Sequence, residues 1–170
     1  MVDKRDHSPA PGDGEASRPA RLEDLVRLCR ALNERKAKYI VIGGTAMIQL
    51  GFVRATEDID LLVSTEPGNE GRVIQAVGTL ADHAALEIKP GEIEEFEVIR
   101  VADEIVVDLM ARATDVKYAG AEDQIEWREI QGTRIPFASA GLMLRLKQGL
   151  REKDILDRRF LEALLRSRSD

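Results

Sequence analysis

Apolar residues recur along the chain with two different periods, which predict a mixture of helices and strands. Between residues 21 and 36 the apolar positions lie three or four residues apart, a spacing typical of an amphipathic helix. The run "KYIVIGG" is apolar and ends at two glycines, so it predicts a short strand followed by a turn. "TAMIQLGF" then predicts a short helix and "DIDLLVS" a second strand. Residues 73–80 predict another helix after the break at Pro67 and Gly68.

The second half of the chain predicts two hairpins and a long helical end. "FEVIRV" and "EIVVDLM" would pair around Ala102 and Asp103. "IEWREI" and "TRIPFA" would pair around Gln131 and Gly132. Ser139 is a predicted N-cap, and from there the chain is expected to be helical almost to its end. The expected fold class is therefore α/β (α+β), with a mixed β-sheet flanked by helices and with C-terminal helices.

Composition divides the chain into a tail and one domain. Residues 1–19 hold three of the six prolines together with mixed charges, so we expect a disordered tail there. Residues 20–170 contain no repeat or linker, and their length suits a single domain. No stretch approaches the roughly 18 apolar residues of a membrane span, and the first residues lack the apolar core of a signal peptide. We therefore expect a cytoplasmic protein with no membrane partner.

The formal net charge of -6 argues against non-specific coating of nucleic acid, which requires a positive surface. The charge is uneven, because residues 145–168 carry eight Lys/Arg against four Asp/Glu, a local net charge of +4. Such a basic element in an acidic protein suggests a site for a phosphorylated ligand. The alternative is a solvated helix whose charges pair with one another.

Two aspartates, Asp58 and Asp60, stand at the start of an apolar strand. A charge inside a strand costs several kcal/mol unless something pairs with it. Because side chains alternate, both carboxylates point to the same face, with Cα atoms roughly 6–7 Å apart. A third acid, Asp108, interrupts the apolar run of another predicted strand. Two interpretations are open. Either the strand end is exposed to solvent, or the three carboxylates form a site for hard divalent ions such as Mg²⁺, which prefer oxygen ligands.

Two glycines, Gly43 and Gly44, lie at the predicted strand-to-helix turn, and Thr45 follows them. Backbone N–H groups at such a turn bind phosphate, and glycine allows the phosphate to approach closely. The segment is not a Walker loop, because no Gly-Lys-Ser/Thr follows it, and a bare Gly-Gly is also a common turn. Arg54 precedes the aspartates and would either neutralise phosphate charge or hold the loop.

Taken together, "GG…RATEDIDLLV" and "VVDLM" resemble the nucleotidyltransferase fold of the polymerase-beta superfamily. "LRLKQGLREKDILDRRFL" further resembles the C-terminal helices of its small AbiEii-like (abortive-infection) group, some of which are toxins of type IV toxin–antitoxin pairs. The resemblance covers roughly residues 38–165. It implies that Asp58, Asp60 and Asp108 are catalytic and bind Mg²⁺ or Mn²⁺, with two ions expected. It also implies that Gly43, Gly44 and Thr45 hold the triphosphate of an NTP such as ATP.

In a single helix over residues 140–165, Lys147, Arg151 and Asp154 fall in one polar stripe. Lys147 or Arg151 would then reach the triphosphate while Asp154 orients one of them; the alternative is a set of ion pairs on a surface helix. On the same wheel Asp157 falls within the apolar face. A kink near Gly149 would remove that conflict.

The predicted function is metal-dependent transfer of a nucleoside monophosphate from an NTP to an acceptor hydroxyl. The acceptor would be RNA such as tRNA, a protein side chain or a small molecule, and the last case would resemble an antibiotic adenylyltransferase. The rival hypothesis is a non-catalytic domain of the same fold that acts as a binding or antitoxin partner. A cognate antitoxin or regulator protein is the partner expected of a toxin.

Overall fold

The computed structural model describes residues 1–4 and 16–169. Its centre is a seven-stranded sheet with two parallel pairs, β3 with β5 and β2 with β9; the other neighbouring strands are antiparallel. The mixed sheet predicted from the sequence is therefore confirmed. The strands follow the order β1 (Val2–Asp3), β4 (Val98–Ala102), β5 (Val106–Met110), β3 (Asp58–Val63), β2 (Tyr39–Ile42), β9 (Thr133–Ala138) and β8 (Ile125–Ile130).

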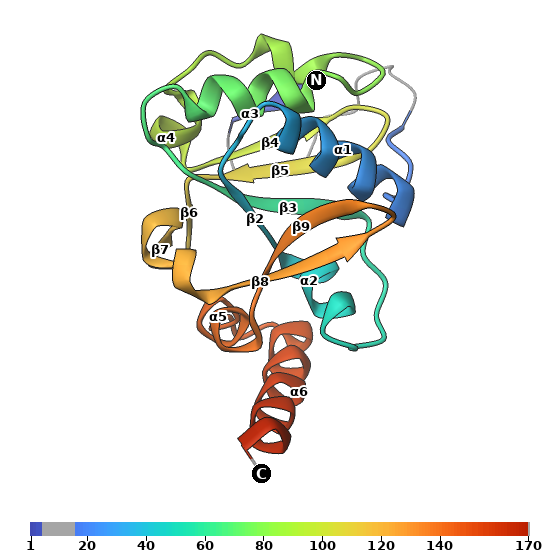
Figure 1. The fold of residues 1–170 in the computed structure, drawn as a ribbon, viewed down its shortest axis with the longest axis vertical. Helices are drawn as coiled ribbons and strands as arrows, with labels where there is room; N and C mark the ends of the chain where they lie inside the picture. Colours follow the sequence, from blue (N-terminus) through green and yellow to red (C-terminus); the bar gives the residue numbers. More distant parts are fainter. Residues whose placement is uncertain (5–15, 170) are drawn as a thin grey trace.

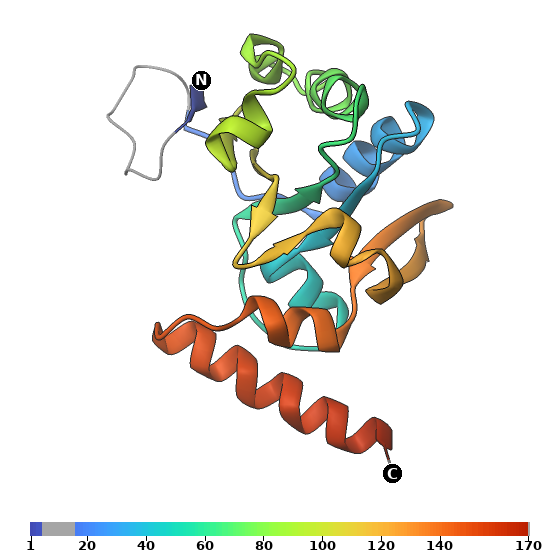
Figure 2. The ribbon, with the colours of Figure 1, turned by 90° about the vertical axis from the view of Figure 1, so that its left-hand side faces the viewer.

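Helices cover both faces of this sheet (Figures 1 and 2). One face carries α1 (Leu22–Glu34), α3 (Asn69–Val77) and α4 (Glu92–Phe96). The other carries α2 (Gly43–Gln49), α5 (Ala140–Leu146) and α6 (Glu152–Ser169). The remaining short elements are β6 (Arg112–Ala113), β7 (Val116–Lys117) and the 3-10 turns η1 (Ala84–Glu87), η2 (Tyr118–Gly120) and η3 (Glu122–Gln124).

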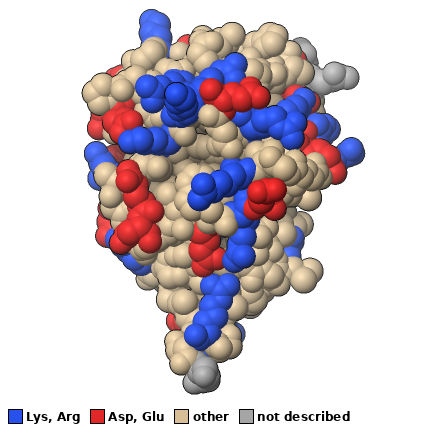
Figure 3. All heavy atoms as spheres, in the orientation of Figure 1, with Lys and Arg blue, Asp and Glu red and all other residues tan. Residues whose placement is uncertain are grey.

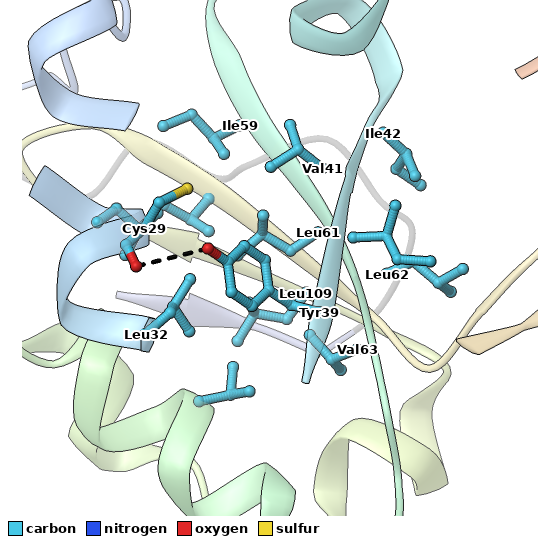
Figure 4. Packing of buried hydrophobic residues seen from close by; sticks show 14 of the residues in the cluster. Cys29, Leu32, Tyr39, Val41, Ile42, Ile59, Leu61, Leu62, Val63 and Leu109 are labelled. Atoms are coloured by element: carbon cyan, nitrogen blue, oxygen red, sulfur yellow. Dashed lines mark hydrogen bonds between the residues drawn. The ribbon is translucent and has the colours of Figure 1, made fainter. Parts of the chain in front are cut away.

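The core lies between the α1/α3 layer and the central strands, where Tyr39 packs against Cys29, Leu32 and Leu61 (Figure 4). All four residues of β2 are buried, and burial of a large apolar side chain contributes about 1.5–3 kcal/mol. The Tyr39 hydroxyl donates a hydrogen bond of 2.9 Å to Oδ1 of Asn33, so its polar end is satisfied. Burial raises the pKa of the Cys29 thiol to about 12. The core therefore holds a protonated thiol that packs as a small apolar side chain.

Both predicted hairpins are present, as β4–β5 and β8–β9. The C-terminal helical segment is broken around Gly149, in agreement with the kink predicted as the alternative to one continuous helix. Ser139 caps α5 as expected, because its hydroxyl accepts a 3.2 Å hydrogen bond from the N–H of Leu142. The helix then stops at Leu146, and α6 begins at Glu152. Arg158 donates to the carbonyls of Lys147 at 2.9 Å and Gly149 at 2.6 Å, which stabilises the break.

Parts of the segment predicted as a disordered tail contact the domain, while residues 5–15 lie outside the described residues. Val2 and Asp3 pair with β4 as an edge strand. Arg18 donates to both carboxylate oxygens of Asp24, at 2.6 and 2.8 Å. In these flanking parts the structure differs from the prediction, because backbone pairing and a bidentate ion pair hold segments that have little apolar surface to bury.

None of the helices in the described part of the chain combines the length and apolar character that a membrane span requires.

Candidate functional site

The three predicted acids come together on one face of the central sheet. In the parallel pair β3–β5, Asp60 lies opposite Asp108, and Asp58 precedes Asp60 by two residues on the same strand. Since alternate residues share a face, the register places all three carboxylates on the same side. Alternation along β3 predicted that Asp58 and Asp60 share a face. The alignment of Asp108 with them depends on the pairing of β3 with β5, which cannot be read from the sequence.

The protein environment disfavours ionisation of two of these acids. Burial raises the pKa of Asp60 to about 7, and repulsion from Asp58 and Asp108 adds to the effect, while Lys147 and Arg100 oppose it. Burial likewise raises the pKa of Asp108 to about 6, with Arg100 opposing the rise. The cluster is therefore short of positive charge, which is the condition under which a bound cation stabilises carboxylates.

Arg100 is a site residue that the sequence did not reveal. It lies opposite Asp108 in the antiparallel pair β4–β5. Its guanidinium donates to Oδ2 of Asp58 at 3.0 Å and lies 3.4 Å from Oδ2 of Asp108. In "VIRVA" an arginine on an alternating strand is ordinary for a solvent-facing position, so only the pairing of three strands shows that it reaches the acids.

The donor set suits Mg²⁺ or Mn²⁺, although the carboxylates are not preassembled around a cation position. Within residues 1–4 and 16–169, no three His, Cys, Asp or Glu side chains are grouped closely enough to hold a metal, and Arg100 contacts two of the acids. Oδ1 of Asp108, however, is buried and has no hydrogen-bond partner among the described residues. Such an oxygen is costly in a native structure, and a hard cation would satisfy it.

The two glycines have a steric role beside Asp60. Gly43 has a φ of +66°, and a Cβ added to it would lie 1.9 Å from Oδ2 of Asp60. A Cβ on Gly44 would lie 2.6 Å from Oγ1 of Thr56. Glycine is therefore required for the turn to approach β3 so closely. Thr45 follows as a partly exposed residue of α2, and phosphate binding by this turn stays a prediction.

Asp157, which the helical wheel left unexplained, is the centre of a buried ion-pair network. It is 1% exposed, and its Oδ2 accepts a 2.7 Å bond from Arg54 and lies 3.0 Å from Nζ of Lys147. Arg54 thus holds the loop before β3 against α6. The charge of Lys147 also lowers the pKa of Asp60, against the larger effect of burial.

The other two residues of the predicted polar stripe behave differently. Asp154 is buried and lies 3.7 Å from Lys147, in keeping with a role in orienting that lysine. Arg151 pairs with Asp154 at 3.1 Å, but its side chain is 75% exposed. The structure thus pairs Lys147 with two buried acids of α6, while Arg151 is largely in solvent.

No protein-family model matches the chain, and no curated protein sequence does either. Solved structures with a similar fold include the lincosamide antibiotic adenylyltransferase LnuA bound to lincomycin, with a TM-score of 0.56, 16% identity, and coverage of 86% of this chain and 99% of that one.

Two further solved structures are similar. An antigenic nucleotidyltransferase-like protein from Paracoccidioides brasiliensis has a TM-score of 0.57 and 17% identity, over 88% of this chain and 78% of that one. A candidate nucleotidyltransferase from Thermotoga maritima has a TM-score of 0.52 and 17% identity, over 85% of this chain and 97% of that one. At these identities the likeness concerns the fold alone, and membership of the AbiEii-like group stays a prediction. The chain has the nucleotidyltransferase fold.

Proposed function

We propose that this protein is a metal-dependent nucleotidyltransferase that moves a nucleoside monophosphate from an NTP to an acceptor hydroxyl. The observation that carries the proposal is the alignment of Asp58, Asp60 and Asp108 on one face, with a buried oxygen of Asp108 left unpartnered. Fold alone does not fix activity, and it is this constellation that favours catalysis over the non-catalytic partner domain.

In this proposal the three aspartates hold the divalent ions, Mg²⁺ or Mn²⁺. Such ions, when bound, neutralise charge on the phosphates and lower the pKa of an acceptor hydroxyl. In the reaction, the acceptor oxygen forms a bond to the α-phosphorus, the bond to the α,β-bridging oxygen breaks, pyrophosphate leaves, and the hydroxyl proton passes to solvent.

The cationic side chains beside the acids would position the phosphates. Lys147 is held by Asp157 at 3.0 Å and would contact the triphosphate as a point charge. The Gly43–Gly44 turn, with Thr45, would supply backbone and hydroxyl donors. Arg54 is tied to Asp157 at 2.7 Å, so its role in the proposal is to keep the loop before β3 in place.

A cavity of about 190 Å³ beside Asp58 is the candidate binding site for the acceptor substrate. Pockets that enclose a drug-sized ligand measure about 300–1,000 Å³, so this cavity would admit only the reactive end of an acceptor. On the face shown in Figure 3, basic and acidic side chains are interspersed. The lining residues are Ser17, Arg18, Pro19, Glu57, Asp58, Arg100 and Val106.

Similarity to a lincomycin-bound adenylyltransferase gives the small-molecule acceptor one specific argument. Toxin–antitoxin membership rests on the sequence resemblance of the C-terminal helices alone. We therefore keep the antibiotic adenylyltransferase as the second candidate and test both activities in one assay.

The assay incubates each labelled NTP with Mg²⁺ or Mn²⁺ and a panel of acceptors: total cellular RNA, the protein itself, aminoglycosides and lincosamides. Wild type should transfer label to one class, and Asp60→Asn should lose transfer by orders of magnitude. Glu129→Gln, at an exposed position on β8, is the control and should retain activity. If wild type labels no acceptor while a biological effect persists in Asp60→Asn, the binding-domain hypothesis replaces the enzyme.

A further inference from the structure

The guanidinium of Arg100 contacts two of the carboxylates that the proposed function assigns to metal. It donates to Asp58 at 3.0 Å and lies 3.4 Å from Asp108. Among the described cations near the site, the others have different partners: Arg18 pairs with Asp24, and Lys147 pairs with Asp157. Arg100 is therefore the cation that shares its partners with the proposed metal.

We propose that Arg100 is an internal counter-cation that competes with divalent metal for Asp58 and Asp108 and thereby sets the metal affinity of the site. The inference rests on the proposed function, because it concerns the same three aspartates. A guanidinium fork and a metal ion both require carboxylate oxygens, and two cations at one pair of carboxylates repel each other. Metal binding then requires that Arg100 leave.

The position of Arg100 allows such a movement without disturbing the core. Its side chain is 47% exposed, so it can rotate into solvent. The β1–β4 register places Asp3 directly opposite Arg100, and paired residues of antiparallel strands have Cβ atoms about 4.5–5.5 Å apart on one face. A third acidic residue thus lies on the strand beside Arg100 that is away from Asp108.

Displacement also changes the cavity beside Asp58, which Arg100 lines together with Arg18 and Glu57. With its two aspartate partners bound to metal, the guanidinium loses the two carboxylates that hold it in the lining of this cavity. Metal binding would therefore free the guanidinium of Arg100 to donate hydrogen bonds to an acceptor substrate in this cavity. The same event would prepare the three aspartates to bind the NTP through the metal.

The test measures Mn²⁺ binding by electron paramagnetic resonance and by thermal shift, with no nucleotide and no turnover. Arg100→Gln removes the competing charge. Arg128→Gln is the matched control, because Arg128 is 48% exposed and pairs with Glu126 at 2.9 Å on an edge strand outside the carboxylate cluster. Arg100→Lys keeps one charge but cannot bridge two carboxylates as a fork.

Arg100→Gln should bind Mn²⁺ roughly two- to thirtyfold more tightly than wild type, as expected for the loss of two partly exposed ion pairs. Arg100→Lys should lie between the two, and Arg128→Gln should match wild type. Without metal, Arg100→Gln should melt at a lower temperature and gain more from Mn²⁺. If Arg100→Gln does not fold, Arg100→Lys decides the question on its own.

Equal Mn²⁺ affinity in wild type and the Arg100 variants, or weaker affinity in the variants, overturns the counter-cation proposal while the metal site stands. If neither wild type nor any variant binds Mn²⁺, the metal site itself fails, and with it the proposed function. The two failures are therefore distinguishable.

Discussion

Replacement of Asp60 by Asn should stabilise the metal-free protein above neutral pH, although the same change should abolish nucleotidyl transfer. The side chain keeps its size but loses a charge that is disfavoured by burial and by repulsion from Asp58 and Asp108. A residue that costs stability in this way is expected when its charge exists to bind a ligand, as the proposed function requires of Asp60.

The size of the effect follows from the pKa of Asp60, which rises from 3.8 to about 7 on folding. A raised carboxyl pKa means that the folded state binds its proton more tightly than the unfolded state does. Asp60 therefore costs no stability below about pH 4, costs more as the pH rises through the folded pKa, and reaches a plateau above it. Three pKa units correspond to about 4 kcal/mol. Because the side chain is partly exposed, we expect about 1–3 kcal/mol.

Urea unfolding in EDTA at pH 6 and pH 8 would measure this effect. Lower pH values are less suitable, since the pI of about 5.1 favours precipitation there. The advantage of Asp60→Asn should be about 0.3–1 kcal/mol larger at pH 8 than at pH 6. Glu129→Gln on the exposed face of β8 should show no such dependence. An equal advantage at both pH values, or a variant less stable than wild type at pH 8, would refute the argument.

Three further outcomes are expected. Mg²⁺ and NTP together should raise the melting temperature by more than the sum of their separate effects, measured by thermal shift at millimolar ligand; strict additivity would contradict a shared site. Lys147→Ala should weaken NTP binding about tenfold or more by calorimetry, because a charge-assisted contact is lost, whereas unchanged affinity would remove Lys147 from the site. Deletion of residues 1–19 should lower the melting temperature by several degrees, because β1 and the Arg18–Asp24 pair are lost; an unchanged melting temperature would mean that these contacts add nothing.

The strands β2, β3, β4, β5, β8 and β9 and their two hairpins could be predicted because each is coded by a local pattern, whereas the two-residue strands β1, β6 and β7 were not. Alternation in β4, an apolar run in β2 and Gly132 in the turn between β8 and β9 act over a few residues. The same alternation placed Asp58 and Asp60 on one face. The sequence could not show which residue of β5 lies beside them, because register between strands distant in sequence depends on the whole sheet.

Arg100 and Asp157 could not be assigned for the same reason. Arg100 looks ordinary in its own segment, as an arginine on an exposed strand face, whereas Asp157 conflicts with the apolar face of its helix without revealing its partner. Their roles arise from pairing across 42 residues to Asp58 and across 103 residues to Arg54. Buried charges of this kind are visible in a sequence only as conflicts with a local pattern, which is how Asp157 drew notice.

The break between α5 and α6 explains how the buried Asp157 contacts both Arg54, from the loop before β3, and Lys147, from the end of α5. In a continuous helix, Asp157 would lie within the apolar face and Lys147 would be fixed by the helical path. Because the chain leaves the helix after Leu146, Lys147 instead reaches back to Asp157 at 3.0 Å, beside the Arg54 contact. Gly149 is needed there, since a Cβ would lie 2.3 Å from a carboxylate oxygen of Asp154. A Gly149→Ala change should therefore shift the network, and it should weaken NTP binding in the same direction as Lys147→Ala although it removes no charge.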